Sequence, residues 1–132
     1  MILILDTSFL IRIATRPLPS ENLSASFGGY TRVTVVEVIS ELERIAKRTY
    51  TRRGKDARLA LAYAKDLRIV GDDKNRDDRG FPSADGRILK YAKGKKDVAI
   101  ASLDRALLEK ARRQGIRIIS LSRGRLVGSP VL

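Results

Sequence analysis

The chain begins with a short apolar run that ends abruptly in polar residues: ILILDTS, residues 2–8. Four successive aliphatic residues without a helical period indicate a strand that is buried on both faces of a sheet. Asp6, Thr7 and Ser8 follow, and residues of these types commonly begin a helix. The stretch therefore predicts a buried strand at 2–5, followed by a short helix that Pro17 and Pro19 end.

The rest of the chain repeats this alternation of strand and helix. Strands are expected at 32–36, 67–70, 98–103 and 116–121, where aliphatic and β-branched residues concentrate. Helices are expected from residue 37 over about 12 residues, and at 54–66, 83–93 and 104–114, with a polar loop at 71–82. This alternation predicts a parallel sheet covered by helices on both faces, the doubly wound α/β class, in a single domain spanning residues 1–132.

The composition removes several kinds of catalytic chemistry. The 132 residues include no cysteine and no histidine. Disulfides, thiolate or imidazole metal sites, and mechanisms that use a Ser-His or Cys-His pair are therefore excluded. Carboxylates, lysine, tyrosine or a hard metal ion remain as the means of catalysis.

The charge balance points to a polyanionic partner. Lys and Arg total 27 while Asp and Glu total 15, which gives a formal net charge of +12. Neutralisation of phosphates dominates binding to nucleic acid, so we expect so basic a small protein to bind it. The alternative is a highly charged surface such as thermophile proteins carry. No apolar run reaches the roughly 18 residues that a membrane span needs, so we expect a cytoplasmic protein that does not enter a membrane.

Acidic residues are expected at one edge of the predicted sheet. Asp6 follows the first strand and Asp104 follows the fourth. The carboxyl ends of parallel strands meet at one edge, where ligands bind in doubly wound folds. Asp85 lies in the first turn of the helix that Ser83 is expected to cap, and helix starts face the same edge.

The helix after the second strand adds two glutamates, Glu37 and Glu41, which are one turn apart. Each of these acids, taken alone, is explained by a helix cap or by a favourable interaction with a helix dipole. Taken together, several carboxylates at one edge repel one another, and a divalent cation is the usual remedy. An all-oxygen site of this type selects Mg²⁺ or Mn²⁺.

Four short motifs, taken in order, resemble those of the PIN-domain ribonucleases. They are Asp6-Thr7-Ser8, Ser40-Glu41-Leu42-Glu43, Ala84-Asp85 and Leu103-Asp104-Arg105, and they span nearly the whole chain. The chain looks closest to the branch that contains rRNA-processing nucleases of the Fcf/Utp type and their archaeal, VapC-like relatives, through the segments 40–44, 58–66 and 100–105. The resemblance implies a PIN-like parallel sheet with an acidic metal site, and endonuclease activity on single-stranded or looped RNA.

The resemblance also assigns the acids individually. The family's first Asp matches Asp6, its helical Glu matches Glu41, and its two later acids match Asp85 and Asp104. These four are the expected catalytic residues and the expected ligands of Mg²⁺ or Mn²⁺. Many members of the branch carry a second Asp after the third acid, where this chain has Gly86, so we expect a thinner outer shell around the metal.

Short polar and basic residues near these acids are candidates for supporting roles. Thr7, Ser8 and Ser102 are suited to hydrogen-bond the carboxylates or a phosphate, or simply to cap helices. Glu37 is an auxiliary candidate, or else a charge that the helix dipole favours. The planar fork of arginine suits phosphate, so we expect contacts with the RNA backbone from Arg44, Arg48, Arg52, Arg53, Arg105, Arg112 and Arg113.

Two classes of function stay open on the sequence alone. The first is a metal-dependent ribonuclease, either an enzyme of rRNA or tRNA processing or the toxin of a VapC-like pair. The second is a non-catalytic RNA-binding or ribosome-assembly module that keeps the fold. RNA is the expected partner in both, and further candidates are a second copy of the chain, an antitoxin and pre-ribosomal particles.

Overall fold

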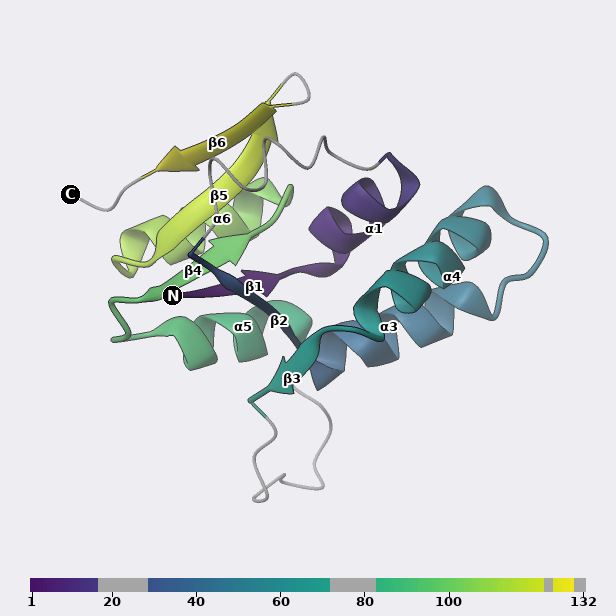
Figure 1. Ribbon diagram of the computed structural model, residues 1–132, viewed down its shortest axis with the longest axis horizontal. Helices are drawn as coiled ribbons and strands as arrows, with labels where there is room; N and C mark the ends of the chain where they lie inside the picture. The colour runs from purple at the N-terminus through teal and green to yellow at the C-terminus, as the bar shows by residue number, and fades with distance from the viewer. Residues whose placement is uncertain (17–28, 72–82, 123–124, 130–132) are drawn as a thin grey trace.

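A mixed sheet of six strands forms the centre of the protein (Figure 1). This computed structural model describes residues 1–16, 29–71, 83–122 and 125–129. The elements in chain order are β1 Ile2–Leu5, α1 Thr7–Thr15, β2 Thr31–Val35, α3 Val36–Ala46, α4 Arg52–Ala64, β3 Arg68–Val70, α5 Ala84–Ala92, β4 Val98–Ala101, α6 Arg105–Arg113, β5 Arg117–Ser122 and β6 Arg125–Ser129. The predicted loop at 71–82 and the helix-ending Pro17 and Pro19 lie outside the described residues, apart from Gly71.

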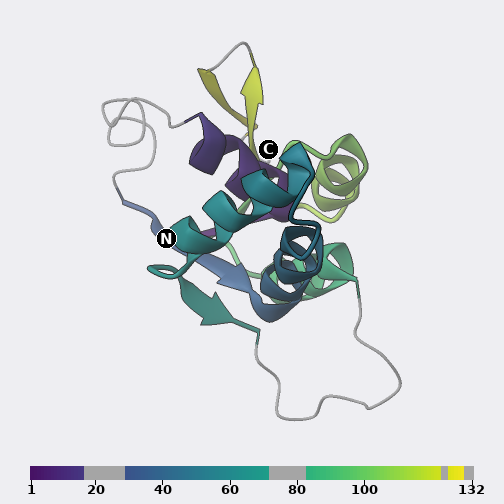
Figure 2. The same cartoon turned by 90° about the vertical axis from the view of Figure 1, so that its right-hand side faces the viewer.

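The strand order is β3-β2-β1-β4-β5-β6, and the first five of these strands run parallel. The doubly wound α/β prediction is confirmed for these five strands and the helices that flank them. Helices α1, α3 and α4 pack together, and α5 packs against α6 (Figure 2).

The expectation that the sheet ends with the strand at 116–121 is wrong. β6 pairs antiparallel with β5, with Ser122 opposite Arg125 and Ile118 opposite Ser129. An antiparallel neighbour needs only a tight connection, whereas a parallel one needs a crossover of a dozen or more residues. The few residues after β5 are therefore enough to add an edge strand without another helix.

The two central strands provide the deepest part of the core. Leu3, Ile4 and Leu5 of β1 are at most 2% exposed, and all four residues of β4 are buried. Neighbours on both sides and helices on both faces remove water from them, and full burial of one such aliphatic side chain contributes about 1.5–3 kcal/mol. Strands buried in this way read as continuous apolar runs, as the sequence indicated.

The junction between α3 and α4 is built around a glycine. α4 begins at Arg52, not at Gly54 as expected, because Thr51 caps it by accepting a hydrogen bond from the Gly54 amide at 2.9 Å. Gly54 lies against the carbonyl of Arg48, and an added Cβ would come within 1.9 Å of that oxygen. The glycine therefore permits a close approach inside the first turn of the helix. It does not start the helix.

Within the described residues, no helix has both the length and the apolar character that a membrane crossing requires.

Candidate active site

The carboxyl ends of β1 and β4 meet at the point where the strand order reverses. From β1 the chain continues to β2 and β3 on one side, and β4 and β5 lie on the other. The amide of Asp6 donates to the carbonyl of Ala101 at 3.0 Å, so the two strand ends are joined by a hydrogen bond. Ligands bind at such a switch point because the loops diverge there and leave a crevice.

Asp6 occupies this point and is held by two serines. Its side chain is almost fully buried, with a residue exposure of 4%. Its Oδ2 accepts hydrogen bonds from Ser102 Oγ at 2.7 Å and from Ser8 Oγ at 3.2 Å. Although Asp6 is the N-cap residue of α1, its side chain makes no capping bond. The Asp6 carboxylate therefore lies at the strand ends and does not cap the helix.

Burial raises the pKa of Asp6 above its ordinary value, and the negative charge of Glu41 adds to the rise. The hydrogen bonds from Ser102, from the Thr7 amide and from Ser8 oppose it, because they stabilise the ionised form. Burial outweighs them. A cation next to Asp6 would reverse the balance by favouring the charged carboxylate.

The same two serines connect Asp6 to the start of α6. Ser8 Oγ accepts from the amide of Leu103 at 3.1 Å, and Ser102 Oγ accepts from the amide of Asp104 at 3.0 Å. Each hydroxyl therefore donates to the Asp6 carboxylate and accepts from the turn after β4. This turn is the reason that β4 ends at Ala101 and not at 103 as the sequence suggested.

Asp104 has a structural duty at this turn. Its Oδ1 accepts a hydrogen bond from the amide of Ala106 at 2.9 Å, which caps α6. Aspartate is among the best residues for this position because it satisfies an otherwise unpaired amide. One oxygen of Asp104 is thus engaged by the helix start.

Glu41 reaches the site from α3. Thr7 Oγ1 donates to Glu41 Oε2 at 3.2 Å, which ties α3 to the first residue of α1. Thr7 is buried and Glu41 is half-buried. The glutamate therefore has a fixed neighbour on one oxygen and access to solvent.

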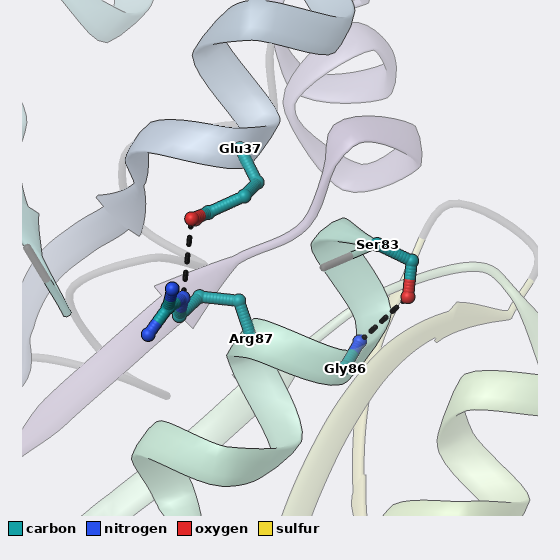
Figure 3. A network of polar contacts seen from close by, with 4 residues as sticks. All are labelled: Glu37, Ser83, Gly86 and Arg87. Atoms are coloured by element: carbon teal, nitrogen blue, oxygen red, sulfur yellow. Dashed lines mark hydrogen bonds and ion pairs between the residues drawn. The ribbon is translucent and has the colours of Figure 1, made fainter. Parts of the chain in front are cut away.

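Asp85 brings the fourth carboxylate, from the first turn of α5. Ser83 caps that helix by accepting from the Gly86 amide at 3.1 Å, as predicted (Figure 3). The pKa of Asp85 is raised, first by burial and then by the negative charges of Asp6, Asp104 and Glu41, while Lys110 lowers it. The four acids, here called the acid cluster, therefore share one electrostatic neighbourhood, although they come from four separate segments of the chain.

The chemistry of the acid cluster fits a hard divalent cation. Carboxylate oxygens are the donors that Mg²⁺ and Mn²⁺ prefer, and mutual repulsion is what a cation would relieve. In residues 1–16, 29–71, 83–122 and 125–129, however, no three acidic side chains lie close enough to hold one ion jointly.

Glu37, one turn before Glu41, lies in a different environment. Arg87 Nε donates to Glu37 Oε1 at 3.1 Å, and the side chains are only 10% and 3% exposed respectively (Figure 3). Glu37 Oε2 is buried without a hydrogen-bond partner. The pair joins α3 to α5 across 50 residues of sequence. Sequence reasoning missed Arg87, since nothing local marks a pairing over that separation.

The arginines expected to hold RNA fall into two groups. Arg44, Arg48 and Arg53 line an open cavity of about 230 Å³ at the junction of α3 and α4, together with Glu41 and Ile45. We call this cavity the arginine pocket. Arg52, adjacent to Arg53, is exposed but does not line it.

The second group lies on a different helix. Arg105, Arg112 and Arg113 are exposed on α6, the helix that begins after Asp104. Arg112 and Arg113 are in the last turn of α6, where the helix dipole also stabilises a positive charge.

Comparison with solved structures identifies the fold. The structure matches "Structure of the PIN domain endonuclease Utp24" with a TM-score of 0.75 and 23% sequence identity, over 99% of this chain and 92% of that chain. No protein-family model matches the sequence, and no curated protein matches it. The fold is therefore PIN-like, as the sequence resemblance implied.

Proposed function

We propose that this protein is a metal-dependent endoribonuclease that hydrolyses phosphodiester bonds of single-stranded or looped RNA with Mg²⁺ or Mn²⁺. The observation that carries the proposal is the buried Asp6 carboxylate at the sheet's switch point, fixed by two serines, together with the electrostatic effect that Asp6, Glu41 and Asp104 have on Asp85. A folded protein gains nothing in stability from such repulsion, so a ligand that relieves it is the simplest reason to keep it.

The four acids would have unequal parts in holding the metal. Asp6 is the most firmly placed, with both serines on one oxygen, and Glu41 is steadied by Thr7. Asp85 is affected by the negative charges of all three other acids, which a cation would offset. Asp104 gives one oxygen to the helix cap, which sets the orientation of its carboxylate.

A divalent cation held there would lower the pKa of a bound water and neutralise charge that develops on the phosphate. The chain itself lacks cysteine and histidine, so this route is consistent with its composition. The buried strand ends and the serine network keep Asp6 in place without reorganisation during the reaction. Preorganised charge of this kind is usually the largest contribution to catalysis.

RNA is proposed as the substrate for two reasons. The net charge of +12 favours a polyphosphate, and the exposed arginines around the cavity at α3 and α4 and on α6 provide forked donors for its backbone. The structural neighbour is named a PIN domain endonuclease, which supports the same chemical class. A processing enzyme of ribosomal RNA or tRNA and a VapC-like toxin would both use this site. An upstream gene for a small antitoxin would favour the toxin, and co-purification with pre-ribosomal particles would favour the processing enzyme.

Two observations favour a second candidate, a non-catalytic RNA-binding or ribosome-assembly module. Among the described residues no three acids form a ready metal cage, and Gly86 stands where the resembling branch carries a further acid. Such a module would keep the arginines and the fold and would bind RNA without cutting it.

Cleavage separates the two candidates. A labelled, unstructured RNA incubated with purified protein should be cut internally with Mg²⁺ or Mn²⁺ and not in EDTA. Asp6→Asn should abolish the products, which excludes a contaminating nuclease. Undiminished cleavage in excess EDTA would refute the metal mechanism, and RNA binding without cleavage in either metal would support the assembly module.

A further inference from the structure

The arginine pocket is a concave, cationic feature that adjoins the acid cluster. Glu41 is common to both, since it accepts from Thr7 on one side and lines the pocket on the other. Glu41, Arg44, Ile45 and Arg48 follow one another at helical spacing on α3 and just beyond its end, so they form one face of that helix. A ligand in the pocket would therefore lie about one side chain away from the proposed metal site.

The corner between α3 and α4 holds the pocket's two ends together. Thr51 donates its amide to the Arg48 carbonyl at 3.3 Å and its hydroxyl to the same oxygen at 3.0 Å. Gly54 packs against that carbonyl in a space that no Cβ would fit. Arg48 and Arg53, on opposite sides of this corner, are brought to the same cavity by fixed backbone geometry.

The pocket carries uncompensated positive charge. In the described part of the chain, no ion pair or side-chain hydrogen bond engages the guanidinium groups of Arg44, Arg48 or Arg53. Three arginines face one glutamate in the lining. Like charges in one cavity repel, and a guanidinium group donates in pairs to planar or tetrahedral oxyanions, so the chemistry of the lining fits phosphate.

We propose that the arginine pocket is a phosphate subsite, which binds a phosphate group of the RNA strand next to the one that is cleaved. The inference rests on the proposed function, because it takes RNA as the ligand. It deepens that function by assigning the path of the strand: from the acid cluster past Glu41 to the corner of α3 and α4. The arginines on α6, which begins after Asp104, would then contact another part of the strand.

Arg52 and Arg53 offer a matched pair for the test. They are neighbours in the first turn of α4, both are exposed, and only Arg53 lines the pocket. Binding of a short single-stranded RNA is measured by fluorescence anisotropy in EDTA at fixed salt, so that cleavage does not contribute. Arg53→Ala should weaken binding about tenfold, as expected for loss of a hydrogen bond between charged groups. Arg52→Ala should weaken it about twofold, through general charge alone.

A third variant and two RNA ends sharpen the result. Arg53→Lys keeps the charge but loses the planar fork, so it should bind nearly as weakly as Arg53→Ala. Each protein is titrated with the same RNA carrying either a 5′-phosphate or a 5′-hydroxyl. A terminal phosphate in the pocket gives wild type a preference for the phosphorylated strand that Arg53→Ala abolishes. An internal phosphate gives equal weakening of both strands.

Equal weakening by Arg52→Ala and Arg53→Ala would overturn the subsite, because it would mean a diffuse cationic surface. Full binding by Arg53→Lys would overturn it for the same reason. These outcomes are independent of catalysis. If wild type cleaves RNA but Arg52→Ala and Arg53→Ala bind RNA equally, the proposed nuclease function stands and the proposed phosphate subsite is refuted. If the protein does not cleave RNA but needs Arg53 to bind it, the proposed nuclease function is refuted and the phosphate subsite is supported.

Discussion

Glu37 and Glu41 lie one turn apart on the same helix, yet the protein treats their charges in opposite ways. Glu37 is buried and forms an ion pair with Arg87, whose Nε lies 3.1 Å from Glu37 Oε1. Glu41 is half-buried, accepts a hydrogen bond from a threonine hydroxyl, acts electrostatically on the carboxylates of Asp6 and Asp85, and lines a cavity with three arginines. A carboxylate with an internal counterion stabilises the fold, whereas a carboxylate without one can respond to an ion or ligand from outside.

The largest effect should come from breaking the sealed pair. Arg87→Ala leaves Glu37 charged and buried without a partner, which should lower the free energy of unfolding by about 3–5 kcal/mol. Urea unfolding monitored by circular dichroism measures it. The double variant Glu37→Gln with Arg87→Met should recover most of the loss, because both charges are then gone. A loss below about 1 kcal/mol in Arg87→Ala, the range of a surface ion pair, would show that the pair does not seal the helices together.

Substitution of Glu41 should lower cleavage and leave the stability of the protein almost unchanged, the reverse of what is expected for Glu37. Glu41→Gln removes a proposed metal ligand, so cleavage of RNA with Mn²⁺ should fall about 10²- to 10³-fold, or roughly 2.7–4 kcal/mol of transition-state stabilisation. Its urea midpoint should stay close to that of wild type. Glu37→Gln is the comparison: it should lose stability while the protein that remains folded still cleaves. An inactive Glu37→Gln beside an active Glu41→Gln would exchange the two roles.

A smaller effect should appear in the metal dependence of stability. Mn²⁺ that binds only the folded protein should stabilise wild type by about 2.7 kcal/mol at a concentration one hundred times the Kd. Asp85→Asn should melt higher than wild type in EDTA, because the other three carboxylates no longer repel it, and should gain less from Mn²⁺. Scanning fluorimetry measures both. Asp66→Asn, an exposed acid after α4, is the control that should gain as much as wild type.

Asp104→Asn, measured in the same way, distinguishes a ligand from a cap. Asparagine caps a helix nearly as well as aspartate, so the bond to the Ala106 amide survives the change. If Asp104 is a metal ligand, Asp104→Asn should therefore gain less stability from Mn²⁺ than wild type, with little other change in its stability. An unaltered gain would leave Asp104 as a helix cap alone.

The smallest expected effect concerns the arginines at the end of α6. Replacing both Arg112 and Arg113 by glutamate should flatten the dependence of RNA affinity on salt, by about 0.7 in log-log slope for each phosphate that is no longer neutralised. Anisotropy titrations between about 50 and 200 mM salt measure the slope. An unchanged slope would show that the RNA does not contact the last turn of α6.

The parts of the fold that the sequence predicted well are those written locally. The central strands are unbroken apolar runs, and Ser83, whose side chain caps α5, marks the start of that helix. The positions of Asp6 and Asp104 follow from the rule that parallel strands end at one edge. These statements need only a few neighbouring residues and a general property of doubly wound sheets.

The parts that escaped depend on contacts between distant or ambiguous residues. β6 contains glycine and lies at the edge of the sheet, so it carries little strand signal. Gly54 looks like a helix start, and only the approach of the Arg48 carbonyl shows why it lies inside α4. The partner of Glu37 is 50 residues away, and no local pattern tells a buried charge from an exposed one at a helix start.

The serine network has a consequence for the order of events during synthesis. Ser102 and Asp6 are 96 residues apart, and β1 has β4 as one of its two sheet neighbours. Ribosomes add roughly 5–20 residues per second, so β1 leaves the ribosome well before its partner exists. The switch point cannot close until residues 98–104 have emerged, which places assembly of the acid cluster late in folding. A nascent chain whose residues 98–104 are still inside the ribosome therefore cannot have assembled the acid cluster, and any activity that depends on the cluster should begin only after this segment has emerged.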